Sequence, residues 1–416
     1  MQVFKFGGAS VKNAEGVKNL ASVLKQVGYN NTLVVVSAMG KTTNSLELVI
    51  KNYFDDKAKL ANSILEVKAF HESILIDLFE HIHHPIFKTI TTIFGDLDSF
   101  LRRNKSPDYN FVYDQVIGFG ELISTKIISA YLDQIGLKND WLDVREFIKT
   151  DNYYRRANVD WEQTQHQIKA NFDTKILNIT QGFLGSDANN FTTTLGREGS
   201  DYTAAIFGYC LNAESVTIWK DVPGVLNADP RYFENAQLLN RISYTEAIEL
   251  AFYGASVIHP KTLQPLQQKE IPLFVKSFLN PTNLGTRVGK GFGIEPNIPC
   301  YIVKKNQVLV SLSSLDFSYI LEENISEIFK LLHLYKMKVD VIQNSAISFS
   351  VCFENTYGNL ERLLQHLKAK FKVTVYEDVS LYTVRHYNDQ AIASVEKGKK
   401  LLLKQLTQET IQIVTT

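Results

Sequence analysis

Three residues near the start of the chain could bind an anion. Lys5, Gly7 and Gly8 lie in the segment KFGGAS, within and just after the short apolar run of residues 3–6. Glycines allow a tight turn, and a helix that follows such a turn presents unpaired N–H groups and the positive end of its dipole. A phosphate group could therefore lie against the main chain with the Lys5 ammonium beside it. An ordinary strand-to-helix turn remains the alternative, because neither G-x-G-x-x-G nor the Walker pattern is present.

Three later segments also combine polar side chains with glycines. FGELISTK, residues 119–126, places Glu121 directly after a glycine, so we expect this carboxylate at the start of a helix. The loop of residues 179–205 and the segment WKDVPGVLNADPR, residues 219–231, each continue from a strand-like run. Four polar loops at strand ends predict one shared cleft. The charged and hydroxyl side chains of the last two loops include Thr192, Thr193, Thr194, Arg197, Ser200, Asp201, Lys220, Asp221, Asp229 and Arg231.

The elements of the first 290 residues explain why these loops should meet. Short runs rich in β-branched and aromatic residues predict strands at residues 32–38, 141–144, 175–180, 215–219 and 271–275. Helical patterns at residues 14–27, 122–135 and 202–211 separate them. This alternation predicts an α/β fold with a mostly parallel sheet sandwiched by helices, in which ligands bind at the carboxyl ends of the strands.

Two stretches interrupt the alternation. Residues 43–104 contain no clear strand and predict a helical insertion. Residues 277–300 hold four glycines and three prolines, so we place a loop-rich link and a domain boundary there. The first domain is therefore expected over residues 1–290.

Beyond the link the order of elements changes. Residues 300–378 predict β-α-β-β-α-β, the ferredoxin-like α+β arrangement. Residues 379–416 add a strand, a helix expected at 391–406 and a last strand, TIQIV. Such a fragment cannot cover its own apolar faces, so it should complete a neighbouring unit or pair with a second chain. The region could serve oligomerisation alone or ligand sensing.

The composition argues against several classes of protein. Lys plus Arg and Asp plus Glu number 44 each, which argues against nucleic-acid binding. Three distant cysteines, Cys210, Cys300 and Cys352, form neither a disulfide framework nor a thiolate metal site, and they fit a reducing cytoplasm. The chain shows no signal-peptide layout and no apolar run near the roughly 18 residues that a membrane span needs.

Six segments, in this order, resemble the motifs of aspartate kinases in the amino acid kinase superfamily: KFGGAS, GELIST, TQGF, TTLGREGSDYTAA, WKDVPGVLNADP and GASVIHP. The region after residue 300 is similar to the ACT regulatory domains that follow the kinase domain in that family. The resemblance covers nearly the whole chain. It implies ATP-dependent phosphorylation of the aspartate side-chain carboxylate to 4-phospho-aspartate, the first step toward lysine, threonine and methionine.

The resemblance also implies roles for individual residues. Lys5 and Gly8 stabilise the transferring phosphoryl group, and Asp201 orients the active-site cations beside the substrate. Arg197 binds the α-carboxylate and Glu121 the ammonium of aspartate. The other residues expected on the substrate side are Ser37, Thr43 and Ser200, and those on the ATP side are Lys5, Gly7, Gly8, Ser10, Lys220, Asp221, Val225, Asp229, Pro230, Arg231 and Ser256.

The implied chemistry needs cations more than a base. A carboxylate is already ionised at neutral pH, so the obstacle is repulsion between anions, which positioned cations reduce. The expected cofactors are ATP and Mg²⁺, with the ion held largely by phosphates and water because no carboxylate cage is visible in the sequence.

Some residues depart from the family pattern. Ala9 replaces a usual threonine, Ser256 a lysine near the nucleotide phosphates, and Glu198 a glycine or asparagine beside Arg197. These changes favour, as an alternative, a weakly active or non-catalytic regulatory homologue; another acidic amino acid as acceptor is a third hypothesis. The stretch SLDFSYILEENISEIF lacks the glycine of lysine-sensitive relatives, which predicts weak or altered feedback control. A homodimer through the ACT region is expected.

Overall fold

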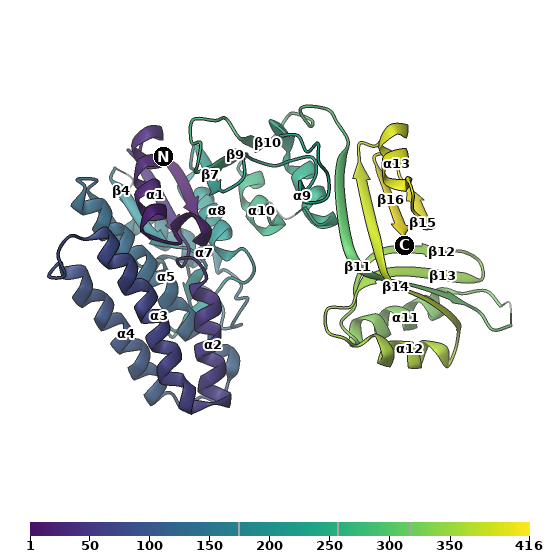
Figure 1. Ribbon diagram of the computed structural model, residues 1–416, viewed down its shortest axis with the longest axis horizontal. Coiled ribbons are helices and arrows are strands. Elements are labelled where there is room, and N and C mark those ends of the chain that lie inside the picture. Colours follow the sequence, from purple (N-terminus) through teal and green to yellow (C-terminus); the bar gives the residue numbers. More distant parts are fainter. Residues whose placement is uncertain (174, 256–257, 317) are drawn as a thin grey trace. The chain divides into compact units, whose positions relative to one another are not determined.

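The computed structural model describes residues 1–173, 175–255, 258–316 and 318–416, which form two compact units (Figure 1). The first unit comprises the described residues of Met1–Val225, Leu238–Ile248 and Val257–Gly293. The second comprises the described residues of Leu226–Gln237, Glu249–Ser256 and Ile294–Thr416. Two short segments from within the kinase-like sequence therefore group with the C-terminal region.

The first unit is built on an eight-stranded sheet with the order β3-β4-β2-β1-β7-β9-β10-β8. Its paired strands run parallel except for the antiparallel pair β9 and β10, which confirms the predicted mostly parallel sheet. The strands are β1 (Gln2–Phe6), β2 (Thr32–Val36), β3 (Asn139–Leu142), β4 (Leu177–Gln181), β7 (Ser215–Lys220), β8 (Arg241–Ser243), β9 (Leu273–Ser277) and β10 (Thr286–Gly289). Each of the five predicted strands overlaps one of these. The strands β8 and β10 were missed, and β10 lies in the glycine-rich link.

The strand β2 shows why this sheet must be covered on both sides. All five of its residues are buried, as expected for a parallel strand that has helices on each face. Helices α5 (Tyr109–Gln134) and α8 (Gly199–Leu211) contact strands of this sheet. The other helices of this part of the chain are α1 (Ala14–Val27), α6 (Val144–Phe147), α7 (Trp161–Asn171), α9 (Tyr244–Tyr253) and α10 (Pro260–Gln268). A two-stranded ribbon, β5 (Leu184–Ser186) with β6 (Thr192–Thr194), completes the unit.

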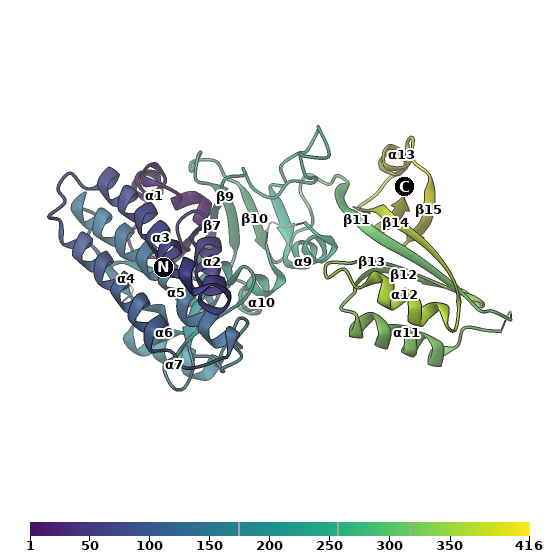
Figure 2. The same cartoon turned by 60° about the horizontal axis from the view of Figure 1, so that its bottom comes forward.

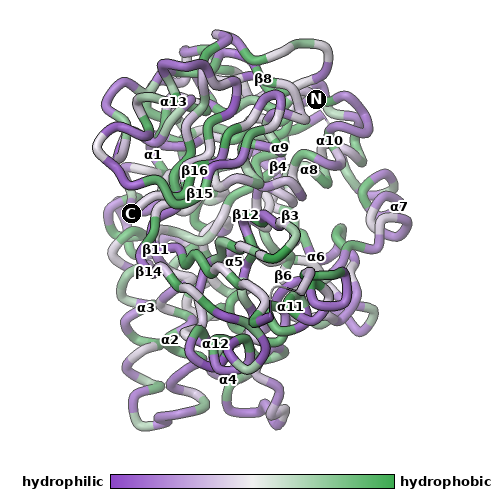
Figure 3. Tube along the Cα trace, turned by 90° about the vertical axis from the view of Figure 1, so that its right-hand side faces the viewer, coloured by the Kyte–Doolittle hydropathy of each residue, from purple (hydrophilic) through white to green (hydrophobic). Residues whose placement is uncertain are grey.

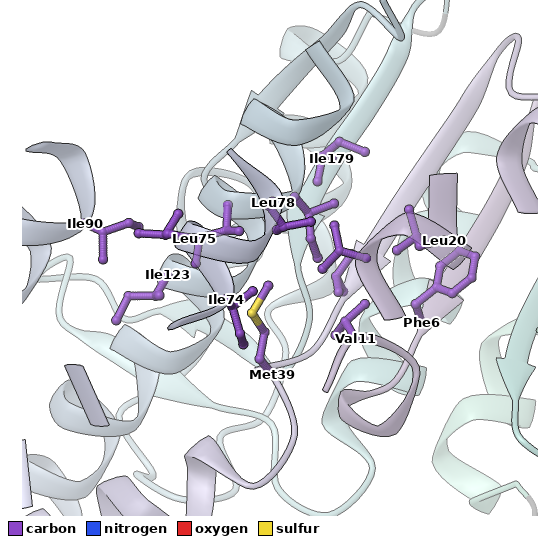
Figure 4. Packing of buried hydrophobic residues seen from close by; sticks show 14 of the residues in the cluster. Phe6, Val11, Leu20, Met39, Ile74, Leu75, Leu78, Ile90, Ile123 and Ile179 are labelled. Carbon is purple, nitrogen blue, oxygen red and sulfur yellow. The ribbon is translucent and has the colours of Figure 1, made fainter. Parts of the chain in front are cut away.

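The predicted helical insertion is present as three helices, α2 (Thr42–Asp55), α3 (Lys57–Leu78) and α4 (Pro85–Arg103), which run beside α5 (Figures 1 and 2). Apolar and polar residues alternate along these helices (Figure 3). On α4 the buried residues recur at helical spacing: Ile86, Ile90, Phe94, Leu97 and Leu101. Their side chains join those of α3 and α1 in one continuous core (Figure 4).

The expected helix start at Glu121 is wrong. The helix α5 begins at Tyr109, after the cap Asp108, so Glu121 lies well inside it. The glycines before it serve close packing rather than a turn. A Cβ at Gly118 would lie 3.1 Å from Thr192 Cγ2, and one at Gly120 would lie 3.1 Å from Thr42 Cγ2.

The second unit is an antiparallel sheet of six strands in the order β12-β13-β11-β14-β16-β15. Along residues 300–378 the observed order is the predicted β-α-β-β-α-β. The elements of the unit are β11 (Cys300–Ser313), α11 (Glu322–Leu334), β12 (Lys338–Asn344), β13 (Ser348–Glu354), α12 (Leu360–Lys368), β14 (Lys372–Arg385), α13 (Asp389–Glu396), β15 (Leu401–Leu406) and β16 (Thr410–Thr415).

The predicted helix at residues 391–406 is wrong in its second half. The helix α13 ends at Glu396, Gly398 adopts a positive φ of 73°, and the following residues form β15 against β16. The C-terminal fragment is completed within the same chain. Its strand β16 pairs with the second half of β14, which also pairs with the first half of β11.

The two longest strands, β11 and β14, run through both halves of this sheet. Their pairing shifts register between Lys304 and Leu309. Near this shift, Asn306 and Asp378 have positive φ angles of 56° and 55°. In the part of the chain that the structure describes, no helix is long and apolar enough to cross a membrane.

Candidate active site

A buried carboxylate joins two lysines at the carboxyl ends of the central strands. Asp201, in the first turn of α8, has an almost fully buried side chain. Its Oδ1 lies 2.6 Å from the Nζ of Lys5 on β1, and its Oδ2 lies 3.8 Å from the Nζ of Lys220 at the end of β7. Because β1 and β7 are neighbouring parallel strands, the sheet itself brings the two ammonium groups to one edge.

Glycine backbone contacts bring the loops after β1 and β2 together. A Cβ at Gly8 would lie 2.7 Å from the carbonyl oxygen of Ala38 and 3.0 Å from that of Gly40, so only glycine fits here. The N–H of Gly40 donates to the carbonyl of Gly8 at 3.0 Å. The predicted glycine turn is followed by a 3₁₀ turn, η1 (Gly8–Val11), before α1 starts.

A second pair of glycines brings the loop after β4 against the start of α8. A Cβ at Gly182 would lie 2.4 Å from Ser200 Cβ, and one at Gly199 would lie 2.5 Å from Phe183 Cδ2. Glu198, just before α8, adopts a left-handed conformation with φ of 53°. Backbone strain of this kind persists where the surrounding structure enforces it, often at functional sites.

These loops surround a cavity of about 470 Å³. Of the predicted site residues, the cavity brings together Lys5, Ser37, Thr43, Glu121, Arg197, Ser200, Asp201 and Lys220. Its lining also contains Tyr113, Arg155, Phe183, Gly196, Glu198 and Gly199. The roles of the eight predicted residues stay predictions, but their side chains come from distant motifs and line the same cavity.

The residues expected on the nucleotide side are placed differently. Among them, only Lys5 and Lys220 belong to the described lining of the cavity. Gly7, Gly8 and Ser10 lie next to Lys5 at the end of β1, and a Cβ at Gly7 would lie 3.2 Å from the Lys5 Nζ. Asp221 is exposed directly after β7.

The rest of the nucleotide-side prediction falls mostly outside the first unit. Val225 belongs to the first unit, where its N–H donates to Thr286 Oγ1 at 2.8 Å. Asp229, Pro230 and Arg231 belong to the second unit, and the Arg231 guanidinium donates to both carboxylate oxygens of Asp229. Ser256 lies outside the described residues.

The carboxyl group of Glu121 lies in an unusual environment. Its side chain is buried, and burial raises its pKa from an ordinary value of 4.5 to about 8. Its Oε2 is buried and has no hydrogen-bond partner among the described residues. A buried oxygen without a donor favours binding of a cationic group from a ligand.

Sequence reasoning missed three lining side chains, Tyr113, Arg155 and Phe183. The Tyr113 hydroxyl donates to Glu47 Oε1 at 2.9 Å, and the Arg155 guanidinium lies over the Tyr113 ring, 4.3 Å from its centroid. Tyr113 lies in the part of α5 that the sequence analysis had not assigned to a helix. The adjacent arginines in YYRRAN, after the strand β3, were the only available signal for Arg155.

Comparisons with known proteins agree with this architecture. The model of the "Amino acid kinase family" matches residues 1–277. The chain is 30% identical to the lysine-sensitive aspartokinase 3 of Escherichia coli K12, over 91% of this chain and 85% of that protein. It is 32% identical to the chloroplastic aspartokinase 1 of Arabidopsis thaliana, over 85% of this chain and 63% of that protein.

Solved structures give the same result. The crystal structure of E. coli aspartokinase III in complex with lysine and aspartate is similar with a TM-score of 0.84 at 28% identity, over 100% of this chain and 95% of that chain. The structure of the same enzyme with aspartate and ADP gives a TM-score of 0.80 at 27% identity, over 100% and 96%. The chain described here therefore belongs to the amino acid kinase family and, within it, to the aspartokinases.

Proposed function

We propose that the cavity transfers the terminal phosphoryl group of ATP to the side-chain carboxylate of L-aspartate, which gives 4-phospho-L-aspartate. The observation that carries this proposal is the pair of ammonium groups, from Lys5 and Lys220, held on the buried Asp201 in a cavity that also contains Arg197 and Glu121. The similarity to an aspartokinase solved with aspartate and ADP supports the choice of substrates.

The arrangement supplies positive charge where phosphoryl transfer needs it. The acceptor carboxylate is already ionised, so catalysis requires positioning and stabilisation of the negative charge on the transferring group. Lys5 and Lys220 provide that charge, and Asp201 fixes their amines. The planar guanidinium of Arg197 suits the α-carboxylate, because it can donate to both oxygens at once.

Glu121 is the proposed partner of the substrate ammonium. With a pKa of about 8, its carboxyl group is mostly protonated in the ligand-free cavity at neutral pH. An ammonium group beside it favours the ionised form, so aspartate binding should release a proton below about pH 8. Aspartate affinity should accordingly fall as the pH decreases from 8 to 6.

The chain offers little to hold a metal by itself. Among the described residues there is no group of three or more His, Cys, Asp or Glu side chains suited to a metal ion. This donor set fits a Mg²⁺ that is held mainly by ATP phosphates and water. When bound, the ion would neutralise part of the phosphate charge.

One observation favours the weakly active homologue as a second candidate. Glu198 lines the cavity, and its Oε2 is buried without a hydrogen-bond partner among the described residues. A carboxylate beside Arg197 opposes the binding of an anionic substrate. An assay of ADP release with L-aspartate, with hydroxylamine trapping of the acyl phosphate, separates the two candidates.

The substitution Lys5→Ala tests the central role. We expect turnover per folded molecule to fall by about a hundredfold or more, as for the loss of an electrostatic stabiliser. Lys25→Ala is the control, because Lys25 is exposed on α1 outside the cavity lining. Near-normal turnover of folded Lys5→Ala would show that Lys5 does not stabilise the transferring phosphoryl group.

A further inference from the structure

Arg155 is held in a backbone conformation that arginine rarely adopts. Its φ is 69°, in the left-handed region where a side chain is strained. Its N–H lies 3.0 Å from both carboxylate oxygens of Asp114, which is fully buried. Asp114 also accepts hydrogen bonds from the N–H and the hydroxyl of Thr194, each at 2.8 Å. A buried carboxylate on α5 therefore ties residue 155 to the strand β6 and enforces the strained conformation.

The side chain of Arg155 is directed by a second contact. Its guanidinium lies over the ring of Tyr113, and Tyr113 is itself held by its hydrogen bond to Glu47. Stacking uses the face of the guanidinium and leaves its N–H groups available at the edge. Both residues line the cavity, and no ion pair of Arg155 is found within the described residues. Arg155 is exposed and its charge also acts on Asp114, so its guanidinium edge is accessible to a ligand in the cavity.

Arg155 lies beside the loop that carries Arg197. A Cβ at Gly196 would lie 3.4 Å from the carbonyl oxygen of Arg155, and Gly196 directly precedes Arg197. The two backbone segments are therefore in contact, and both arginines belong to the lining of one cavity. Lys5 and Lys220 are instead fixed on Asp201, so the two guanidinium groups are the lining cations left for a carboxylate that does not react.

We propose that Arg155 is a specificity-determining residue, which binds the α-carboxylate of the acceptor together with Arg197. This inference rests on the proposed function for the identity of the acceptor. It predicts that the site selects amino acids with a free α-carboxylate and discriminates against the α-amide of aspartate, which has the same shape but one charge less.

The variant Arg155→Gly tests this pairing without adding strain, because glycine adopts a positive φ readily. We expect KM for L-aspartate to rise by about tenfold or more, because the variant loses a charge-assisted hydrogen bond to the substrate. KM for ATP and kcat should change by less than about twofold, since the residue acts on the non-reacting carboxylate. The preference for L-aspartate over its α-amide should fall by a similar factor, and Arg155→Lys should restore only part of it.

Arg156→Ala is the matched control. Arg156 is the neighbouring arginine and is exposed like Arg155, but it lies over the ring of Tyr153, 5.2 Å from its centroid, and is absent from the cavity lining. Its KM values should match those of the unsubstituted chain. An unchanged KM for L-aspartate in folded Arg155→Gly, or an equal rise in Arg156→Ala, would overturn the proposal.

Calorimetric titration with L-aspartate separates this inference from the proposed reaction. If the unsubstituted chain binds L-aspartate but releases no ADP, the proposed catalysis fails and the effect of Arg155→Gly on the dissociation constant still decides the role of Arg155. If the unsubstituted chain does not bind L-aspartate, both proposals fail. Weaker binding by Arg155→Gly, with Arg156→Ala unchanged, supports the pairing.

Discussion

Asp201 carries a buried negative charge that depends on its neighbours. The Lys5 ammonium lies 2.6 Å from it, and the Lys220 ammonium lies 3.8 Å from its second oxygen. Removing one partner of a buried ion pair commonly costs about 3–5 kcal/mol, because the other charge is left uncompensated. Lys5→Ala should therefore lose stability as well as turnover, and its activity must be compared at equal concentrations of folded protein.

The substitution Glu121→Gln should separate stability from binding. The folded pKa of about 8 exceeds the ordinary 4.5, so the stability linked to this group is complete below about pH 4.5 and is lost as the pH rises through 8. We expect the ligand-free variant to gain about 1–4 kcal/mol in unfolding free energy at pH 9 and less at pH 6.

The same variant should bind L-aspartate at least about tenfold more weakly, because the charge that faces the ammonium is gone. Urea unfolding at the two pH values and calorimetric titration measure these two effects. A variant that is no more stable at pH 9, yet keeps its affinity for aspartate, would contradict the assigned environment of Glu121.

For single residues, the sequence was informative about which side chains form the site but not about the backbone conformations that position them. Lys5, Arg197 and Asp201 were identified from motifs, and the fold brings them to one cavity. Arg155 was missed, because its position depends on a left-handed backbone that Asp114 enforces from 41 residues away. A long-range contact of this kind leaves no local pattern.

The helix α3 supports the loop between β2 and α2. His71 is fully buried, its Nδ1 donates to the carbonyl of Val67 at 2.8 Å, and its Nε2 lies 3.3 Å from the hydroxyl of Thr42. Burial lowers the pKa of His71 to about 4, so the imidazole is neutral near pH 7. The loop that ends at Thr42 and Thr43 also carries Ser37, and the insertion thus braces one wall of the cavity.

His71→Phe should disturb this wall more than it disturbs the fold. We expect KM for L-aspartate to rise severalfold and the unfolding free energy to fall by about 1–3 kcal/mol, since Thr42 and Val67 lose a hydrogen-bond partner. In the unsubstituted chain the stability linked to His71 is complete above about pH 6.5 and is lost as the pH falls through 4, and the variant should lack this dependence.

Ile74→Val on the same helix is the control for His71→Phe. It removes one buried methylene, at a cost of about 0.5–1.5 kcal/mol, and leaves the hydrogen bonds of His71 to Thr42 and Val67 in place. Steady-state kinetics of both variants, together with urea unfolding, make the comparison. Equal KM values for the two variants would show that His71 contributes only to packing.

The elements with strong periodicity were predicted best. The helix α1 spans the predicted residues 14–27, and the helical insertion is present. The strands β10 and β15 were missed, because the glycine-rich context of β10 and the sequence LLLKQL of β15 give no alternating pattern. Glu121 was misplaced because glycines inside a helix resemble a turn until the strands and helices that they contact are known.

The division of the structure into two compact units could not be predicted from the order of elements along the sequence. The described residues of Leu226–Gln237 and Glu249–Ser256 group with the C-terminal unit although they lie between strands of the first. The expected boundary near residue 290 assumes contiguous domains, and it stays a prediction. The homodimer expected through the second unit stays a prediction, which sedimentation equilibrium of the purified chain checks.

The three cysteines should be inert in the folded molecule. All three are buried, and burial raises the pKa of the Cys210 thiol to about 11 and that of Cys352 to about 12. We expect almost no reaction with a thiol-specific disulfide reagent at pH 8 and complete reaction of three thiols in denaturant. Rapid labelling of the native chain would indicate local opening around these side chains.

The paired irregularity in β11 and β14 constrains how chimeras with other aspartokinases can be made. Asn306 and Asp378 lie close to the register shift that joins the two halves of the sheet. A junction between parents that keeps one irregularity and loses the other would offset the strands by one residue, which turns every following side chain to the opposite face. A graft of the C-terminal half must therefore carry residues 300–308 along with it, although some 70 residues separate that strand from the rest of the transplanted piece.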